Sequence, residues 1–387
     1  MKSKSIYQVI FFHLIVFSCS KDAGNCISDH DSQVIKGENT IKLDIPLEGR
    51  PYDFSVFSVC EDADTTFLYY YTADQHAVQI VNLNEKRFLP AIKLASEGTE
   101  GIPTVDDMVV MHPDTIFLFS EEYQKGFWIR PNGVIIDVKD FSEFSSNEAI
   151  PVYIVNKSPY SKIQVTPNKT FLFQISYELS DEYYTPELYH FPHIGIWQPG
   201  TETIQNTGTF PDNYQQERTA FEDYYPIAYN NRAGIIATAF GSSHLIGATS
   251  IKDQQTQFAC VASAHLPVVF NLLRYDAPFE KRNELYRTEG FYTHILYDSY
   301  RDLYVRLVKH AQERTDVDGK LRQYLQSSWS MIVLNKNFQI EREINLPAEN
   351  YQFDITAITR MGLLVSRETP YAQDNQEEML NLALINL

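Results

Sequence analysis

Two short polar clusters have the residue types of metal sites. His190 and His193 place two imidazoles three positions apart, but zinc needs further ligands and these two need not share one face of a strand. Asp316 and Asp318 precede Gly319, as at the start of a calcium loop. The third closely spaced ligand and the closing Glu of such a loop are missing. We interpret the histidines as edge or loop residues and the aspartates as a turn, and we predict no metal and no cofactor.

Motifs for covalent or nucleotide chemistry are absent from the sequence. It contains no GxSxG, HExxH, GxGxxG or P-loop pattern, so it offers no nucleophile elbow, zinc helix or phosphate cradle. The tyrosine-rich stretches 69–71 and 224–225 are interpreted as packing residues, with an aromatic platform for sugars as the alternative. We predict no catalytic residues. Whether the chain is an enzyme stays open, and a non-enzymatic role is favoured.

Cys19 has the strongest local signal for a modification. Lys2 and Lys4 precede an apolar stretch over residues 7–17, which is shorter than the roughly 20 residues that cross a bilayer. Its length suits the apolar part of a secretory signal, about 7–15 residues. Val16-Phe17-Ser18-Cys19 resembles a bacterial lipobox, whose cysteine receives lipid and becomes the new N-terminus. The sequence predicts a signal peptide over 1–18 and lipidation of Cys19. An ordinary cleaved signal and a retained anchor are the alternatives.

The segment after Cys19 is polar and lacks periodicity through residue 38. It is predicted to be a tether over 19–38 between the lipid and a domain over 39–387. The predicted location is the cell envelope, on the outer membrane, facing the periplasm or exposed at the surface.

Besides Cys19, the chain has three cysteines, Cys26, Cys60 and Cys260. An odd number argues against a disulfide framework, although one bridge is possible in an oxidising envelope. Cys60 and Cys260 stand in apolar runs and are interpreted as small buried hydrophobic residues.

Composition points to a β protein with an acidic surface. Aromatic residues make up 13% of the chain, and such side chains favour strands. Lys and Arg number 32 against 50 Asp and Glu, which gives a net charge of −18. This charge repels phosphate backbones and anionic lipid, so we predict no nucleic-acid partner and no basic membrane patch. A monomer is expected, with the lipid as its link to the membrane.

A repeated strand opening organises residues 54–387. Asp64-Thr65-Thr66-Phe67-Leu68 is followed by Asp114-Thr115-Ile116-Phe117-Leu118 and by weaker copies downstream. The anchor residues are spaced 50 to 68 positions apart; they are Phe67, Phe117, Phe171, Ile235, Leu303 and Leu363. Each unit resolves into four short strands separated by turns. Repeats of this size and plan predict a six-bladed β-propeller with four-stranded blades.

The two ends of the chain support a closed ring. The sixth unit reaches only its third strand, at 379–387, while an unassigned strand at about 40–46 precedes the first unit. Placing 40–46 beside 379–387 completes the last blade and removes exposed sheet edges. Two stacked β-sandwiches are the alternative, but they leave both terminal strands unexplained.

The propeller predicts where polar side chains converge. The innermost strands begin beside the axis with Asp53, Asp107, Lys162, Tyr225, His294 and Asp354. Asp53, Asp107, Tyr225, His294 and Asp354 are predicted to bind a ligand at this channel mouth. Carboxylates with one histidine could instead hold a divalent cation for hydrolysis. A solvated lining in which aspartates cap turns is the structural alternative.

The Cys19 leader, the D-T-x-F-L openings and the loop Ser96–Gly101 resemble six-bladed propeller lipoproteins of Gram-negative envelopes. In particular, they resemble a family known only as a domain of unknown function. The resemblance implies the fold and the location and supplies no catalytic residues. We predict a lipid-anchored binding or scaffold module for a protein, peptide or glycan ligand. A metal-assisted hydrolase, lactonase or lyase is the alternative, and a sensory or assembly role in an envelope complex is a third option.

Overall fold

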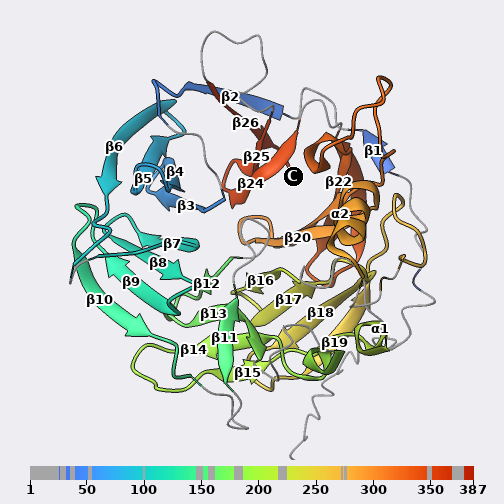
Figure 1. The fold of residues 1–387 in the computed structure, drawn as a ribbon, viewed down its shortest axis with the longest axis horizontal. Coiled ribbons are helices and arrows are strands. Elements are labelled where there is room, and N and C mark those ends of the chain that lie inside the picture. Colours follow the sequence, from blue (N-terminus) through green and yellow to red (C-terminus); the bar gives the residue numbers. More distant parts are fainter. Residues whose placement is uncertain are drawn as a thin grey trace, which may run out of the picture.

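The computed structural model describes residues 26, 32–34, 40–50, 55–98, 101–144, 151–155, 162–177, 186–216, 225–271, 273, 277–346, 351–367 and 379–387. In this part of the chain, six sheets surround a common axis and form a closed ring (Figure 1). The predicted six-bladed β-propeller is therefore confirmed.

Blades one to three follow chain order from the axis outward. Blade one consists of β3 (Phe57–Asp62), β4 (Thr65–Thr72), β5 (Ala77–Asn82) and β6 (Arg87–Lys93). Blade two consists of β7 (Asp107–His112), β8 (Thr115–Ser120), β9 (Lys125–Ile129) and β10 (Ile135–Asp140). Blade three consists of β12 (Gln164–Val165), β13 (Phe171–Tyr177), β14 (Ile194–Trp197) and β15 (Gln205–Thr207). A further strand, β11 (Val152–Val155), pairs with the far half of β13, and the repeat did not predict it.

Blades four to six keep the same order. Blade four consists of β16 (Ile227–Asn230), β17 (Ile235–Ala239), β18 (Leu245–Ser250) and β19 (Thr256–Cys260). Blade five consists of β20 (Phe291–Asp298), β21 (Leu303–Lys309), β22 (Trp329–Asn335) and β23 (Ile340–Leu346). Blade six consists of β24 (Gln352–Thr359), β25 (Gly362–Ser366), β26 (Met379–Ile385) and β2 (Thr40–Pro46).

The second strands are almost continuously apolar because both of their faces are covered by neighbouring blades. In β8, Ile116 and Leu118 pack in a cluster shared with blade one. The alternate residues Phe117 and Phe119 pack in a cluster shared with blade three. Complete burial of a side chain of this size contributes about 1.5–3 kcal/mol. The D-T-x-F-L openings are thus the sequence pattern of strands packed between two blades.

The ring closes as the sequence predicts. β2 pairs antiparallel with β26 over seven residues, from Thr40 beside Ile385 to Pro46 beside Met379. A strand that precedes blade one in the sequence thereby becomes the outer strand of the last blade.

The N-terminal segment is attached to the propeller earlier than predicted. Cys26 is disulfide-bonded to Cys260 at the end of β19, with Cα atoms 5.6 Å apart. A short strand, β1 (Ser32–Val34), then pairs in parallel with β23 on the outside of blade five. Cys26 and Ser32–Val34 thus contact the propeller within the segment 19–38 that was predicted to be a tether. The polar composition of this segment suits the outside of two blades as well as it suits a solvated tether.

The two cysteines in apolar runs have different environments. Cys60 is buried and free, as predicted, and burial raises the pKa of its thiol to about 11. Cys260, predicted to be a small buried residue, is exposed and bridged instead. It ends an outer strand, where side chains alternate between the neighbouring blade and solvent.

Loss of the disulfide is expected to destabilise the propeller. The bridge joins residues 234 positions apart, and closing a long loop restricts the unfolded chain. Replacing Cys26 and Cys260 together with Ser should lower the free energy of unfolding by about 2–4 kcal/mol. Urea denaturation followed by tryptophan fluorescence measures this change. A reductant should lower the wild-type midpoint and leave that of the double variant unchanged. An unchanged wild-type midpoint in reductant would contradict the prediction.

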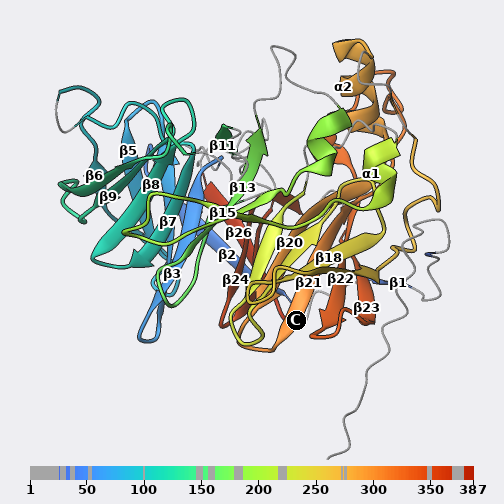
Figure 2. The ribbon, with the colours of Figure 1, turned by 90° about the horizontal axis from the view of Figure 1, so that it is seen from below.

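Both α-helices lie on the same side of the ring (Figure 2). They are α1 (Asp212–Gln216) and α2 (Phe279–Thr288). None of the residues of α2 is buried. The Lys309 amine donates to the carbonyls of Arg287 and Glu289 at 3.0 and 2.7 Å, which holds the C-terminal end of α2 against β21. Among the described residues, no helix has the length and apolar character needed to cross a membrane.

Candidate functional site

The channel has two mouths, which we call the start face and the end face. The innermost strands β3, β7, β12, β16, β20 and β24 begin at the start face and end at the end face, as in other propellers. The connection that carries α2 precedes β20 and therefore lies on the start face. Of the residues predicted as a ligand site, Asp107 begins β7 and Tyr225 comes shortly before β16, so both stand at this face.

A buried aspartate and a half-buried lysine lie together at the start face. Asp107 is completely buried, and its two carboxylate oxygens accept from the backbone N–H groups of Met108 and Ile163 at 2.7 and 2.6 Å. Lys162 lies beside it, and its amine donates to the carbonyl of Phe57. Burial raises the pKa of Asp107 and lowers that of Lys162, while their mutual attraction opposes both shifts. Since Lys162 belongs to blade three and Phe57 to blade one, the side chain reaches past blade two inside the ring.

The other predicted residues of this mouth have separate surroundings. Tyr225 is 8% exposed and packs against the rings of Phe210 and His193, with centroids 5.2 and 5.6 Å away. His294 is 2% exposed, and its Nδ1 lies 2.9 Å from the hydroxyl of Thr293. Asp53 falls outside the described residues, and Asp354 lies in β24 with its side chain outside the described part. The role of these residues in ligand binding stays a prediction.

The two polar clusters of the sequence are built into the fold. His193 is buried with its Nε2 3.2 Å from the hydroxyl of Thr238, and burial lowers its pKa to about 3. The Asp316 carboxylate accepts from the N–H groups of Asp318 and Lys320 at 2.9 Å, which confirms the predicted turn. Within the described part of the chain, no group of three or more His, Cys, Asp or Glu side chains is placed to hold a metal ion.

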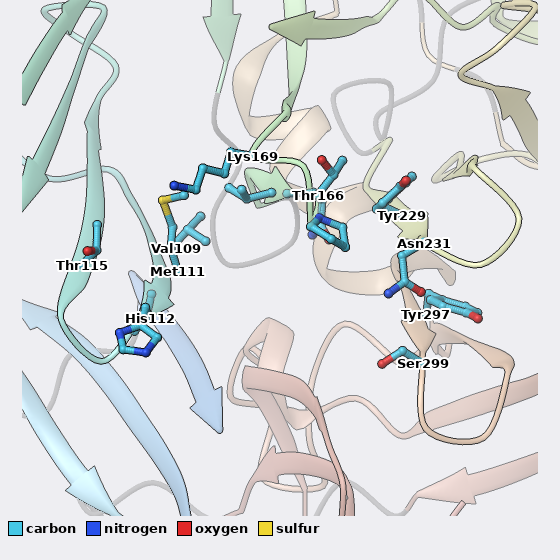
Figure 3. A pocket seen from close by; sticks show the side chains of 14 residues that line it. Val109, Met111, His112, Thr115, Thr166, Lys169, Tyr229, Asn231, Tyr297 and Ser299 are labelled. Atoms are coloured by element: carbon cyan, nitrogen blue, oxygen red, sulfur yellow. The ribbon is translucent and has the colours of Figure 1, made fainter. Parts of the chain in front are cut away.

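A cavity of about 490 Å³ opens at the end face, on the side of blades two to five. Its lining comes from the last residues of β7, β12, β16 and β20 and the turns that follow them. The side chains surround an open space, with His112 and Thr115 facing Tyr229, Asn231, Tyr297 and Ser299 across it (Figure 3). Thr166 and Lys169 lie between these two groups (Figure 3).

The turns hold the lining side chains at the rim. After β12, the N–H of Lys169 donates to the carbonyl of Thr166 at 2.9 Å, and Lys169 has a positive φ of 60°. After β16, the Asn230 side chain accepts from the N–H groups of Arg232 and Ala233 at 3.0 Å. Such side-chain-to-backbone bonds close a turn locally. Asn231 is thereby held at the tip of its turn, where it is exposed.

The remaining blades close the rest of this mouth with charged contacts. Glu61 of blade one accepts from the N–H of Arg360 at 2.7 Å and from its guanidinium at 3.1 Å. Tyr300 of blade five donates to the same carboxylate. Arg301 donates to the carbonyl of Arg360 at 3.0 Å. These contacts join blades five, six and one at the rim of the end face. The cavity therefore opens on the other side of this mouth, along blades two to five.

The lining of the cavity suits a ligand rich in hydroxyl groups. It contains hydroxyls, amides and one imidazole, which can donate or accept; these are Thr115, Thr166, Ser299, Gln164, Asn231 and His112. Tyr229 and Tyr297 contribute aromatic rings, and the Tyr297 hydroxyl donates to Asp302 at 2.7 Å. Among the described residues of the lining, Lys169 contributes a positive charge and none is an aspartate or glutamate, despite the acidity of the chain.

Sequence reasoning missed this cavity because it examined where the innermost strands begin. The repeat did contain residues that mark the position of this cavity. The turn residues before each anchor strand, such as Asp114-Thr115 and Asn168-Lys169, are the turns of the end face. Side chains at these turns converge on the axis as those at the strand starts do.

Comparison with known proteins identifies a family and supports the fold. The family model described as "Domain of unknown function (DUF4221)" matches residues 27–345. A crystal structure of a DUF4221 family member from Bacteroides vulgatus has a TM-score of 0.73 to this chain at 16% identity. The match covers 89% of this chain and 96% of that one.

A second crystal structure has a weaker similarity. It is a protein from Bacteroides fragilis named as a candidate exported protein, with a TM-score of 0.51 and 9% identity. The match covers 92% of this chain and 98% of that one. At these identities the two structures support the propeller fold alone. No curated protein sequence matches this chain.

Proposed function

Because this chain belongs to the DUF4221 family, whose function is unknown, we propose its role from its own cavity: it binds a neutral or acidic glycan at the end face. The observation that carries the proposal is the cavity of about 490 Å³ with hydrogen-bonding groups and two tyrosines in its lining. Its volume falls within the range of about 300–1,000 Å³ found for small-ligand sites.

The chemistry of the lining favours sugars over other small ligands. Sugar hydroxyls both donate and accept, as do the hydroxyl and amide groups around the cavity. The apolar faces of sugar rings pack on aromatic side chains, for which Tyr229 and Tyr297 are available. Lys169 favours a carboxylate on the ligand and disfavours a cationic ligand. A nucleic acid would be repelled by the net charge of −18.

The proposed location is the cell envelope, with Cys19 carrying lipid. The lipobox supports this proposal, and so does the name of the exported protein from Bacteroides fragilis. Oxidising conditions outside the cytoplasm are also those in which a disulfide such as Cys26–Cys260 persists. The protein would act as a lipid-anchored binding module that holds a glycan.

Removing one cavity side chain is expected to weaken glycan binding. The purified protein is applied to an array of neutral and acidic oligosaccharides, and the affinity for the strongest ligand is measured by calorimetry. Asn231→Ala and Tyr229→Ala should each weaken binding by about tenfold, which corresponds to about 1.4 kcal/mol for a hydrogen bond or a ring contact. Ile136→Ala, an exposed change on β10, should leave the affinity unchanged.

A matched pair of variants distinguishes the two mouths. If binding falls with His294→Gln and Asp354→Asn and survives Asn231→Ala, the ligand occupies the start face. That result would refute the cavity proposal and support the ring predicted from the sequence. The absence of binding to any oligosaccharide on the array would refute the glycan as the ligand.

A further inference from the structure

Four exposed apolar side chains lie on the start-face connections of blades four and five. Val268, Val269, Phe279 and Leu321, which we call the apolar group, are 49, 73, 65 and 50% exposed. The first three belong to the connection between β19 and β20, and Leu321 belongs to the loop between β21 and β22. Single exposed apolar residues are ordinary, but a local group indicates contact with a partner or a membrane.

The N-terminal segment is fastened next to this group. The sulfur of Cys26 lies 4.0 Å from the carbonyl of His244, and the imidazole of His244 lies 3.0 Å from the carbonyl of Pro267. Val268 and Val269 follow Pro267 directly. A short chain of contacts therefore connects the Cys26–Cys260 bridge to the apolar group.

The distance from a lipid on Cys19 to the bridge is limited by the covalent chain. Cys19 stands seven positions before Cys26. Seven residues span at most about 25 Å when fully extended. An anchor at Cys19 would therefore keep Cys26 within this distance of the membrane surface and bring the neighbouring start face toward it.

The apolar group has the side chains of an interfacial contact. Phe279 and Leu321 border a hollow of about 340 Å³ between α2 and the loop after β21. Arg287, Arg314 and Arg322 line the same hollow together with Glu280, Glu284 and Glu313, and Arg314 pairs with Glu284 at 3.1 Å. Apolar tips beside long arginine side chains suit the boundary between acyl chains and phosphate headgroups. Three arginines balance three glutamates here, so the hollow lacks the excess of negative charge that the chain has as a whole, which limits the local repulsion from anionic lipid.

We propose that the apolar group rests on the phospholipid membrane, so that the start face lies against the bilayer and the end-face cavity faces away from it. This inference rests on the proposed lipidation of Cys19. The disulfide makes the orientation specific, because it fixes the end of a short tether at blade four. One lipidated segment and one apolar contact together supply the two signals that stable membrane association requires.

Fluorophores at two sites test the orientation in the lipidated, full-length mature protein. A polarity-sensitive thiol dye is attached at Val269→Cys or at Val138→Cys, and the protein is reconstituted in phosphatidylethanolamine–phosphatidylglycerol vesicles. Val138 is 48% exposed on β10 of blade two and serves as the matched control. The dye at 269 should shift to shorter wavelength and lose fluorescence with spin-labelled lipid. The dye at 138 should do neither.

The outcomes separate the orientation from the anchor. If the protein floats with vesicles and both dyes report water, the orientation is refuted while the anchor stands. If Cys19→Ser leaves vesicle association unchanged, the proposed anchor is refuted. Reduction of the disulfide should diminish quenching at 269 while the protein still floats. Undiminished quenching after reduction would refute the role of the Cys26–Cys260 bridge.

Discussion

Replacing Arg306 with Met is expected to lower the free energy of unfolding by about 3–5 kcal/mol, because several buried carbonyls lose their charged donor and each unsatisfied buried group costs about 1–3 kcal/mol. Arg306 stands in the middle of β21 and is completely buried. Burial lowers its pKa to about 10, so its guanidinium remains charged at neutral pH. Its contacts explain how the fold tolerates this charge.

The guanidinium of Arg306 joins blade five to blade four. It donates to five backbone carbonyls at 2.7 to 3.3 Å, those of Phe240, Ser243, His244, Leu245 and Val261. It also lies over the ring of Tyr292, 3.3 Å from the centroid. Methionine fills much of the volume but donates no hydrogen bond. The largest loss of hydrogen-bond energy is expected at Ser243, whose carbonyl accepts the shortest of the five hydrogen bonds.

Chemical denaturation of the wild type, Arg306→Met and Arg306→Lys tests this account. Lysine retains the charge, but its ammonium group cannot donate to five carbonyls as the planar guanidinium does. The Arg306→Lys variant should therefore be nearly as unstable as Arg306→Met. The control is Arg342→Met, which changes an arginine of the outer strand β23 and should lower the free energy of unfolding only slightly. A loss below about 1 kcal/mol for Arg306→Met would show that the network contributes little.

The sequence predicted the strands because each one has a local signal. Alternation, turn residues and the spacing of anchors such as Phe117 and Phe171 specify every blade, and the unpaired strand at 40–46 specifies the closure. Arg306 has no such signal. It interrupts the apolar stretch Leu303–Lys309 as a surface residue would, and the carbonyls it contacts follow from how two blades meet.

The candidate site was predicted less well for the same reason. Sequence order shows which residues lie at an inner strand end, but packing decides which ends are closed. At the start face, Lys162 reaches toward blade one beside Asp107. At the end face, Glu61 and Arg360 close one side and leave the other open. These are contacts between residues of different blades, and no repeat pattern encodes them.

The Cys26–Cys260 bridge was one of several arrangements that the cysteine count allowed. The sequence could not choose among them because Cys26 lies in a polar segment without periodicity. With the bridge in place, the predicted lipid, the apolar group and the cavity acquire a common geometry. Cys26, which would carry the proposed anchor's tether, and the apolar group lie on the start face, and the proposed glycan site opens on the end face.

Acidification is expected to destabilise the protein steeply between pH 6 and pH 4. Burial lowers the pKa of His193 to about 3 and the pKa values of His244 and His310 to about 4, each from an ordinary value of 6.5. The unfolded chain therefore binds protons at these histidines below pH 6.5, while the folded chain does not until about pH 4 or lower. The stability that the neutral histidines contribute is present above pH 6.5 and is lost as the pH falls.

Asp107 works in the opposite direction. Burial raises the pKa of its carboxyl above the ordinary value, so the folded state takes up this proton before the unfolded chain does. Between pH 6 and pH 4, the unfolded state binds about three more protons at the histidines and about one fewer at Asp107 than the folded state. The unfolded state therefore binds about two more protons in total. At about 1.4 kcal/mol per proton and pH unit, stability should fall by about 3 kcal/mol per pH unit.

Denaturation midpoints measured at half-unit steps from pH 7.5 to pH 4 give this slope directly. His193→Gln removes one of the three histidines, so it should reduce the slope by about 1.4 kcal/mol per pH unit even if it also lowers stability at pH 7. His190→Gln changes an exposed histidine three positions away and serves as the control. Equal slopes for all three proteins would mean that His193 is protonated in the folded state. The ring contacts of His193 with Phe210, Tyr225 and Phe240 would then have to accommodate a charge.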